Sequence, residues 1–409
     1  MGQIYQHQLP NGMRLAAEHI ASAQSVAITA LMPAGVTTEP ENRQGVATLA
    51  AEMVCRGAGD LDARDHSDAL DRLGVQRGTG VETNHLRLGA TMLAQNLHEA
   101  LPLLVDMIRR PTLSNDTLDP SRDLALQAIA ALEDEPQQKV FLELRGRHYP
   151  SPICRSPLGQ AAHIESISEQ DIRQFWKSTF VPDQTILGIA GRFDWDRLLA
   201  QINQLFTDWK GTSQPTEVDH AGSRDYHHVM AESAQVHIGL MYDALPEPDD
   251  SSILCRAATA ILSGGMSSRL FTQLREKRGL CYSVYAAYAS QKDRGAILSY
   301  VGTTAPRAQE SLDLLKTELL GLCNGIDENE FNRAIVGMKS RLVMQGESTT
   351  ARASAIAMDQ YLYGRPRQLH ELIERVDGIT IAALRQFVAE NPPGPMTIVT
   401  IGPESLNTT

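Results

Sequence analysis

The sequence predicts an α+β protein built from two similar domains, each a mainly antiparallel sheet packed with helices, joined by a linker. Two observations carry this prediction. The order of the expected elements repeats at an offset of about 210 residues, and a polar segment separates the two repeats. The length of 409 residues agrees with two domains, because single hydrophobic cores stop growing beyond roughly 250–300 residues.

Each repeat begins with an alternating, strand-like segment, followed by a helix, two strands and a second helix. In the first repeat these segments are 25–32, 45–55, 75–83, 86–92 and 97–108. In the second they are 236–242, 253–262, 281–289, 296–302 and 308–322. Long helices are then predicted over 116–132, 137–147, 328–344 and 351–363, with Asp327 or Asn324 as the N-cap of one of them. Because strands neighbour strands and helices follow in groups, the pattern favours α+β over a doubly wound sheet.

The segment 211–224, GTSQPTEVDHAGSR, is polar, contains Gly, Pro and Ser, and has neither the helical nor the strand period. It predicts a linker. The predicted domains are therefore 1–210 and 225–409. A long surface loop within one domain is the alternative, and the repeat on either side favours the linker.

The composition excludes several classes of protein. The chain carries 37 Lys and Arg against 49 Asp and Glu, a net charge of −12, which argues against a general nucleic-acid binder. Its five cysteines are odd in number and form no CxxC, so a reducing compartment is favoured over a disulfide framework. No signal peptide is visible at the start, and no apolar run approaches the roughly 20 residues that span a bilayer. We therefore expect a cytoplasmic protein with neither a nucleic-acid nor a membrane partner.

Four segments resemble the pitrilysin, insulysin and mitochondrial-processing-peptidase superfamily of zinc peptidases. They are LPNGMRL at 9–15, GVATLAAEMVCRG at 45–57, the segment from SPLGQAAHIES to GIAGRFD at 156–194, and GGMSSRLFTQLREKRGLCYSVYA at 264–286. They occur in the family's order and cover nearly the whole chain. The resemblance implies a fold of two similar α+β domains, in agreement with the repeat.

Active members of this family bind zinc through His-x-x-Glu-His on a helix. Two His four residues apart lie on one helical face, the Glu acts as general base, and a carboxylate from a second helix is the third ligand. The resemblance places Thr48, Ala51 and Glu52 at the three motif positions and Ala128 at the third ligand, or Gln127 if the register slips by one. It thus implies a degenerate metal site, with no metal in this chain.

Other residues make a poor replacement for that site. The twelve His include no HxH, HxxH or HxxxH spacing. The adjacent His227 and His228 would point to opposite faces of a strand and are expected to be solvated. Glu52 with His66 falls short of the three protein ligands that a catalytic zinc site needs, and Glu52 is expected to be a partly buried helix carboxylate.

In contrast to the metal site, the segment 274–284 of the second domain keeps the residues of the family pattern. In active members an Arg and a Tyr seven residues apart hold the substrate, and the resemblance places these roles on Arg275 and Tyr282. A guanidinium and a phenol both donate hydrogen bonds to a peptide carbonyl and would stabilise an oxyanion there. Arg275 is expected near a helix end and Gly279 as its left-handed C′ residue, with Tyr282 beginning a strand. Composition alone would favour a solvated Arg and a half-buried Tyr, and the resemblance reverses that preference.

Some members of the family work as heterodimers, in which one subunit carries zinc and the other keeps the Arg/Tyr pair. The resemblance therefore implies a non-catalytic, substrate-binding subunit of a zinc endopeptidase, inactive alone. Its partners would be a peptide substrate and a homologous zinc-bearing subunit. The alternative is a structural or assembly protein, since the core proteins of respiratory cytochrome complexes also resemble the family. An active metallopeptidase is a third hypothesis, against which the residues at positions 48, 51, 52 and 128 argue.

Overall fold

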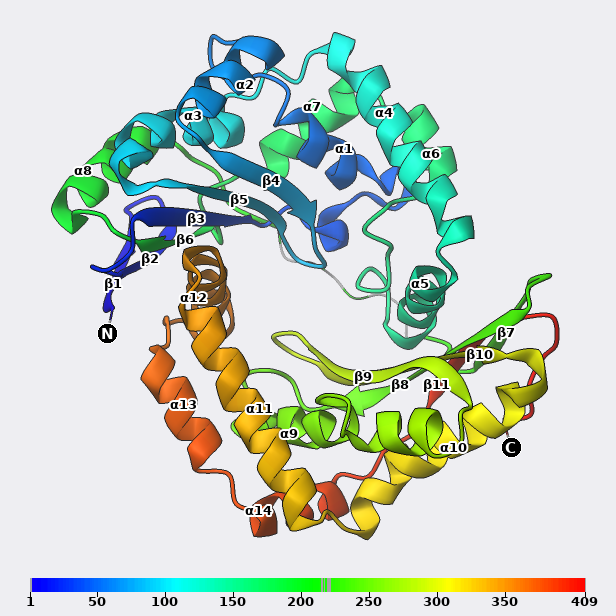
Figure 1. Ribbon diagram of the computed structural model, residues 1–409. Coiled ribbons are helices and arrows are strands. Elements are labelled where there is room, and N and C mark those ends of the chain that lie inside the picture. The colour runs from blue at the N-terminus through cyan, green and yellow to red at the C-terminus, as the bar shows by residue number, and fades with distance from the viewer. Residues whose placement is uncertain (1, 215, 217, 219–221, 409) are drawn as a thin grey trace. The chain divides into compact units, whose positions relative to one another are not determined.

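The chain forms two compact units in the computed structural model, which describes residues 2–214, 216, 218 and 222–408 (Figure 1). Unit 1 comprises Met1–Ala131, Ser151–Asp219 and Gln345–Gln368, and unit 2 comprises Leu132–Pro150, His220–Met344 and Leu369–Thr409. Each unit contains one sheet, mostly antiparallel, packed with helices. The predicted α+β class is thereby confirmed.

The sheet of unit 1 has six strands in the order β1-β2-β6-β3-β5-β4. Their bounds are β1 Gln3–Gln8, β2 Arg14–His19, β3 Ser25–Met32, β4 Gln76–Val81, β5 Leu86–Leu93 and β6 Ile186–Gly191. The pair β2/β6 is parallel and the others are antiparallel. In the register of the central strand, Ile28 lies opposite Ile189 on one side and Ala90 on the other.

Helices cover both faces of this sheet, with α1, α3 and α7 over one face and α12 over the other (Figure 1). The helices of unit 1 are α1 Val46–Met53, α2 Ala63–Arg72, α3 Leu97–Arg109, α4 Asn115–Ala130, α6 Ala161–Ser166, α7 Glu169–Thr179, α8 Trp195–Phe206 and α12 Thr349–Tyr363. The main core of the unit includes the fully buried Leu49, Met53 and Leu101. This packing fixes α1, the helix that carries the candidate metal-site positions.

The sheet of unit 2 has five strands in the order β7-β11-β8-β10-β9. Their bounds are β7 Tyr226–Met230, β8 Gln235–Ala244, β9 Cys281–Ser290, β10 Gly295–Thr304 and β11 Thr397–Gly402. Helix α5 packs against β8 and β11, and α9 and α10 pack against β9 and β10 on the other face (Figure 1). The helices of this unit are α5 Pro136–His148, α9 Ser252–Ser263, α10 Ala308–Gly321, α11 Glu328–Gly346, α13 Leu369–Asp377 and α14 Ile381–Glu390.

The fourteen predicted segments all correspond to elements of the structure, and the predicted strand 25–32 coincides with β3. The predicted cap is also present, since Asp327 Oδ1 accepts a hydrogen bond from the Glu330 N–H at 2.8 Å at the start of α11. Strands β6 and β11 escaped prediction although they lie inside the sheets. Every residue of both strands is buried, so they lack the alternation that marks a half-buried strand.

The two units interleave along the chain in a way that the repeat did not predict. The predicted boundaries at 210 and 225 place residues 132–150 in the first domain and residues 345–368 in the second. In the structure, residues 132–150 belong to unit 2 and residues 345–368 belong to unit 1. The helices concerned, α5 and α12, hold corresponding places in the two repeats. Residues 215, 217 and 219–221 of the predicted linker lie outside the described residues, and its described residues form neither helix nor strand.

In each unit a helix packs closely against a glycine of a central strand. A Cβ atom on Gly188 of β6 would lie 2.4 Å from the Ala353 carbonyl oxygen of α12. One on Gly239 of β8 would lie 2.4 Å from the Val140 side chain of α5. Real Cβ atoms do not approach other atoms so closely, so a larger residue at Gly188 would displace the α12 backbone, and one at Gly239 would displace the side chains of α5.

A buried ion pair joins α12 to the sheet of unit 1. Arg352 Nε donates to Glu18 Oε2 at 2.7 Å, and the two side chains are 4% and 9% exposed. The Arg352 guanidinium also donates to the Arg367 carbonyl at 3.1 Å. A displacement of α12 that separated the two side chains would leave a buried charge without its partner, so the pair favours this one position of α12 on the sheet.

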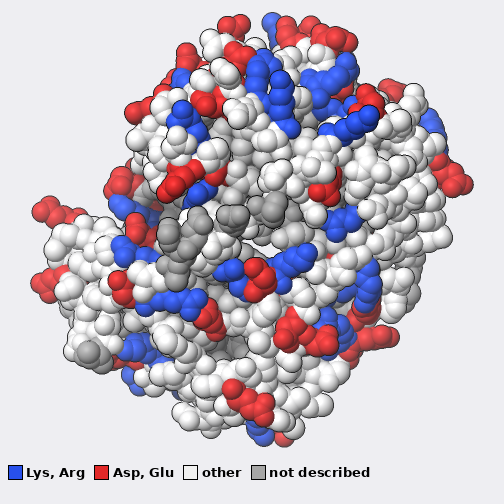
Figure 2. All heavy atoms as spheres, turned by 180° about the vertical axis from the view of Figure 1, so that it is seen from behind, with Lys and Arg blue, Asp and Glu red and all other residues white. Residues whose placement is uncertain are grey.

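The surface carries charges of both signs. On the face drawn in Figure 2, Lys and Arg side chains are interspersed with Asp and Glu. Among the described residues, every helix falls short of the length and apolar character needed to cross a membrane.

We predict that Gly188→Ala lowers the free energy of unfolding by about 1–3 kcal/mol, because the added methyl group forces α12 away from β6. Denaturant unfolding measures this change. The matched control is Gly78→Ala in β4, where an added Cβ would meet nothing within 4 Å. Equal stability of the two variants would contradict the close contact.

Candidate functional site

Helix α1 carries the three positions at which the family motif would place its zinc ligands and base. The Thr48 hydroxyl donates to the Pro157 carbonyl at 2.7 Å. Ala51 is 6% exposed and packs in the core of unit 1. Glu52 Oε1 accepts a hydrogen bond from Arg56 at 2.7 Å, and the Glu52 side chain is 39% exposed. Each of the three positions therefore either lacks a metal donor or has its polar group engaged.

The fourth position lies on α4, which packs against α1. Ala128 is exposed and offers only a methyl group, and its neighbour Gln127 is exposed as well. A catalytic zinc site takes three nitrogen, sulfur or carboxylate donors, and these positions supply only the ion-paired Glu52. The donor set does not fit a zinc ion. Across the part of the chain that the structure describes, no group of three His, Cys, Asp or Glu side chains is placed to hold a metal.

Of the histidines considered as replacements, His66 and His228 each lie within hydrogen-bonding distance of another group. His66 is fully buried, its Nε2 lies 3.1 Å from the Leu103 carbonyl oxygen, and burial lowers its pKa. His227 and His228 both lie in β7, and His228 Nδ1 is 2.9 Å from the Thr400 hydroxyl oxygen. Burial also lowers the pKa of His228. Sequence reasoning expected the last two to be solvated, and the structure places both at intermediate exposure.

A buried carboxylate that the sequence did not reveal holds the start of α1. Glu39 is 5% exposed, and its Oε1 accepts hydrogen bonds from the N–H groups of Gly45 and Ala47, both at 2.9 Å. Burial raises its pKa to about 7, although these two hydrogen bonds oppose the shift. Its other oxygen, Oε2, is buried without a hydrogen bond. A carboxylate at a helix N-terminus is favourable. Glu39 lies too far before α1 in the sequence to be identified as its cap from local spacing.

The Arg275–Tyr282 segment folds as a helix end, a tight turn and a strand, as expected. Gly279 has a φ of +59°, in the left-handed region, which glycine adopts without strain. Its N–H donates to the Arg275 carbonyl at 3.1 Å, and the Leu280 N–H donates to the Leu274 carbonyl at 2.9 Å. Tyr282 is the second residue of β9. This turn brings the two candidate side chains to the same place.

The two side chains contact each other directly. Arg275 Nη1 donates to the Tyr282 carbonyl at 2.8 Å. The guanidinium lies over the Tyr282 ring at 5.0 Å and over the Phe271 ring at 4.7 Å. Such cation–π contacts hold a guanidinium in place without using its N–H donors. The Tyr282 side chain is 83% exposed, so its hydroxyl faces solvent and is available to a ligand.

Two features of this site were not predicted. Phe271–Glu276 is a π-helix, in which the Lys277 N–H reaches the Thr272 carbonyl at 3.0 Å. Segments of this kind are rare and occur frequently at functional sites. Phe271 is the second ring that flanks Arg275, four residues earlier in the chain, and that spacing in the sequence was the signal that could have identified it.

Two family models match the chain. The model described as "Insulinase (Peptidase family M16)" matches residues 14–153, and the model described as "Peptidase M16 inactive domain" matches residues 166–338. Together they span most of the sequence, with the first covering α1 and the second covering the Arg275–Tyr282 segment.

Relatives and solved structures agree with these matches. The "Uncharacterized zinc protease YmxG" of Bacillus subtilis is 25% identical over 384 residues, which cover 92% of this chain and 93% of that protein. The crystal structure of a peptidase M16 inactive domain from Pseudomonas fluorescens has a TM-score of 0.90 at 20% identity and covers 100% of both chains. A chain of complex III2 from Candida albicans has a TM-score of 0.83 at 18% identity, covering 98% of this chain and 96% of that one. At these identities the structures show a shared fold.

We predict that Glu39→Gln makes the free energy of unfolding less dependent on pH. The pKa of Glu39 is raised from 4.5 to about 7, so the folded state binds the proton more tightly. Stability is therefore lost as the pH rises through this window. Glutamine keeps an acceptor for the α1 N–H groups but does not titrate. Between these pH values the free energy of unfolding of the variant should therefore fall by up to about 3 kcal/mol less than that of the unmodified chain.

Urea unfolding at a series of pH values between 4.5 and 8 measures this effect. The matched control is Glu41→Gln, two residues away at an exposed position. A Glu39→Gln variant with the same pH dependence as the unmodified protein would contradict the assignment.

Proposed function

Because this chain belongs to the insulinase (M16) peptidase family, we propose that it is the non-catalytic, substrate-binding subunit of a heterodimeric zinc endopeptidase. A homologous subunit with an intact His-x-x-Glu-His motif supplies the zinc and the general base. This chain supplies Arg275 and Tyr282, which bind the peptide carbonyl. Alone, the chain hydrolyses no peptide.

The observation that carries the proposal is the contrast between the two sites. The positions that would hold zinc are occupied by methyl groups, a hydroxyl bonded to the Pro157 carbonyl and the ion-paired Glu52. The Arg275–Tyr282 pair keeps its donors, since the guanidinium spends one N–H on a carbonyl and the Tyr282 hydroxyl is exposed. An intact donor pair beside a lost metal site suits a subunit that binds substrate for a partner.

The chemistry of the pair fits a peptide carbonyl. A guanidinium and a phenol both donate hydrogen bonds, so both favour an oxygen that gains negative charge. The ring contacts of Arg275 restrict its side chain before substrate arrives, which reduces the entropy lost on binding. The pair thus contributes binding, orientation and stabilisation of the oxyanion, while the attack by water belongs to the partner.

A structural or assembly role is the second candidate, and one observation favours it: the fold matches a chain of complex III2 at a TM-score of 0.83. The exposed donors of the Arg275–Tyr282 pair favour the first candidate, because a scaffold does not require them. The relatives named zinc proteases share the family, and this chain lacks the donor set that their name implies.

We predict that the isolated chain retains well under one zinc per molecule after dialysis and cleaves no peptide. Elemental analysis by mass spectrometry and a quenched-peptide assay measure the two properties. The physical reason is the shortage of ligands at Thr48, Ala51, Glu52 and Ala128. One tightly bound zinc per chain together with peptidase activity would instead identify an active metallopeptidase with a different ligand set.

We also predict that affinity capture of the chain from its native host recovers a stoichiometric partner bearing His-x-x-Glu-His, and that the complex cleaves peptides. Arg275→Ala or Tyr282→Phe in the complex should lower kcat by about a hundredfold, because each removes one donor to the oxyanion. Lys277→Ala, an exposed change on the same segment, is the control. Recovery of the chain alone as a homodimer, or full activity of both variants, would leave the scaffold role as the better account.

A further inference from the structure

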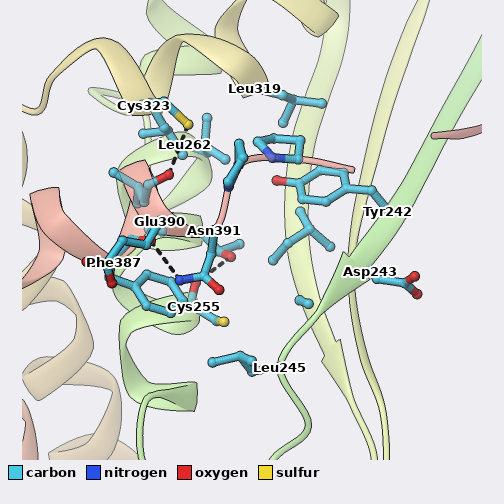
Figure 3. Close-up of a pocket in the computed structure, with 18 residues that line it drawn as sticks. Tyr242, Asp243, Leu245, Cys255, Leu262, Leu319, Cys323, Phe387, Glu390 and Asn391 are labelled. Atoms are coloured by element: carbon cyan, nitrogen blue, oxygen red, sulfur yellow. Dashed lines mark hydrogen bonds between the residues drawn. The ribbon is translucent and has the colours of Figure 1, made fainter. Parts of the chain in front are cut away.

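Unit 2 contains a cavity of about 420 Å³ that the Arg275–Tyr282 pair does not line (Figure 3). It lies between β8, α9, the Leu322–Asn324 turn and the end of α14. The floor includes Leu262 and Leu319, which are 1% and 0% exposed. Asn391 and Pro392 at its edge are exposed. The volume and the mostly apolar lining are those of a small-molecule site.

The hydroxyl of a mostly buried tyrosine points into this cavity. Tyr242 of β8 is 7% exposed, and Figure 3 shows its hydroxyl directed into the space. It makes no hydrogen bond to the residues that the structure describes. The other tyrosines of the same sheet differ, since the hydroxyls of Tyr288 and Tyr300 lie 2.7 Å from the Leu245 carbonyl and His237 Nδ1. The Tyr242 hydroxyl is not among the fully buried polar atoms, so a ligand in the cavity can reach it and accept its hydrogen bond.

The Tyr242 hydroxyl is the available donor of the cavity, because neighbouring polar groups are engaged. The Thr259 hydroxyl donates to the Cys255 carbonyl at 2.8 Å, and Cys323 Sγ donates to the Val388 carbonyl at 3.0 Å. Asn391 Nδ2 donates to the Phe387 carbonyl at 2.9 Å. Burial raises the pKa of Tyr242 well above its ordinary value of 10.0, so the hydroxyl keeps its proton at neutral pH.

Charge at the cavity limits the kind of ligand that fits. The 18 residues that line it include the carboxylates Asp243 and Glu390 and no Lys or Arg. Asp243 is paired with Arg224 outside the lining. Figure 3 shows the Asp243 carboxylate directed away from the cavity. The lining therefore offers no cation to an anionic ligand, and its apolar residues disfavour any charged group. The observations therefore favour an uncharged ligand.

We propose that this cavity binds a neutral, mainly apolar small molecule that accepts a hydrogen bond from the Tyr242 hydroxyl through a carbonyl oxygen. The apolar walls bury the body of the ligand, and Tyr242 fixes its orientation. This site is separate from the Arg275–Tyr282 pair, and its occupancy does not depend on whether the chain serves a peptidase.

The test is fluorescence titration of the full chain with Nile red, a neutral apolar dye with a carbonyl oxygen. Saturable binding at one dye per chain is expected. Tyr242→Phe should weaken binding about fivefold, the worth of one neutral hydrogen bond, and Ala258→Leu should weaken it by filling the cavity. Tyr285→Phe, whose hydroxyl accepts from Gln137 at 2.7 Å outside the cavity, should leave the affinity unchanged.

Two further readouts separate ligand binding from a structural role of the hydroxyl. The melting temperature of the dye-free Tyr242→Phe protein should equal or exceed that of the unmodified chain, because the hydroxyl that is removed bonds none of the described residues. The anionic dye anilinonaphthalene sulfonate should bind more weakly than Nile red. Absence of saturable Nile red binding, equal affinity of the Tyr242→Phe protein, or preference for the anionic dye would each overturn the proposal.

Discussion

The close approach of a helix to a strand glycine is the constraint on which both units depend. Gly188 lets the backbone of α12 come within contact distance of β6, and Gly239 leaves room for the Val140 and Leu144 side chains of α5 against β8. Each helix thereby covers one face of a sheet whose other face packs against other helices, so that the inner strands β6 and β11 are buried on both sides. A sheet buried in this way has little freedom to shift, because a shift would expose apolar residues or break the Glu18–Arg352 ion pair. The candidate sites lie on elements that these sheets hold in place.

The two candidate family sites differ in what their polar groups do within the folded chain. On α1 the hydroxyl of Thr48 bonds a carbonyl and Glu52 pairs with Arg56, so little is left to bind a ligand. Around the π-helix the opposite holds. Arg275 is positioned by two aromatic rings, which take up none of its N–H groups, and Tyr282 extends into solvent. Polar groups that bond one another stabilise the fold, whereas the remaining donors of Arg275 and the exposed Tyr282 hydroxyl are the groups on which the proposed substrate binding rests.

The same reasoning applies inside unit 2. The hydroxyls of Tyr242 and Tyr282 both lack a partner among the described residues, but their surroundings differ. Water satisfies the exposed Tyr282 hydroxyl at no cost, so its significance comes from its place beside Arg275. The Tyr242 hydroxyl belongs to a mostly buried side chain and opens onto a mainly apolar cavity, so its significance comes from the space in front of it. Substrate binding and occupancy of the cavity would thus use different donors in one unit.

Local periodicity in the sequence predicted the α+β class, the repeat and nearly every long helix, and the resemblance to the zinc peptidases implied the positions at which zinc ligands are replaced. The tertiary structure alone decided the rest. Strands β6 and β11 are buried on both faces and carry no alternation, and the interchange of α5 and α12 between the units depends on contacts between residues far apart in sequence. The Glu39 cap and the cavity at Tyr242 likewise arise only when distant segments pack, since the exposure of a side chain and the partners of a polar group are properties of the folded chain.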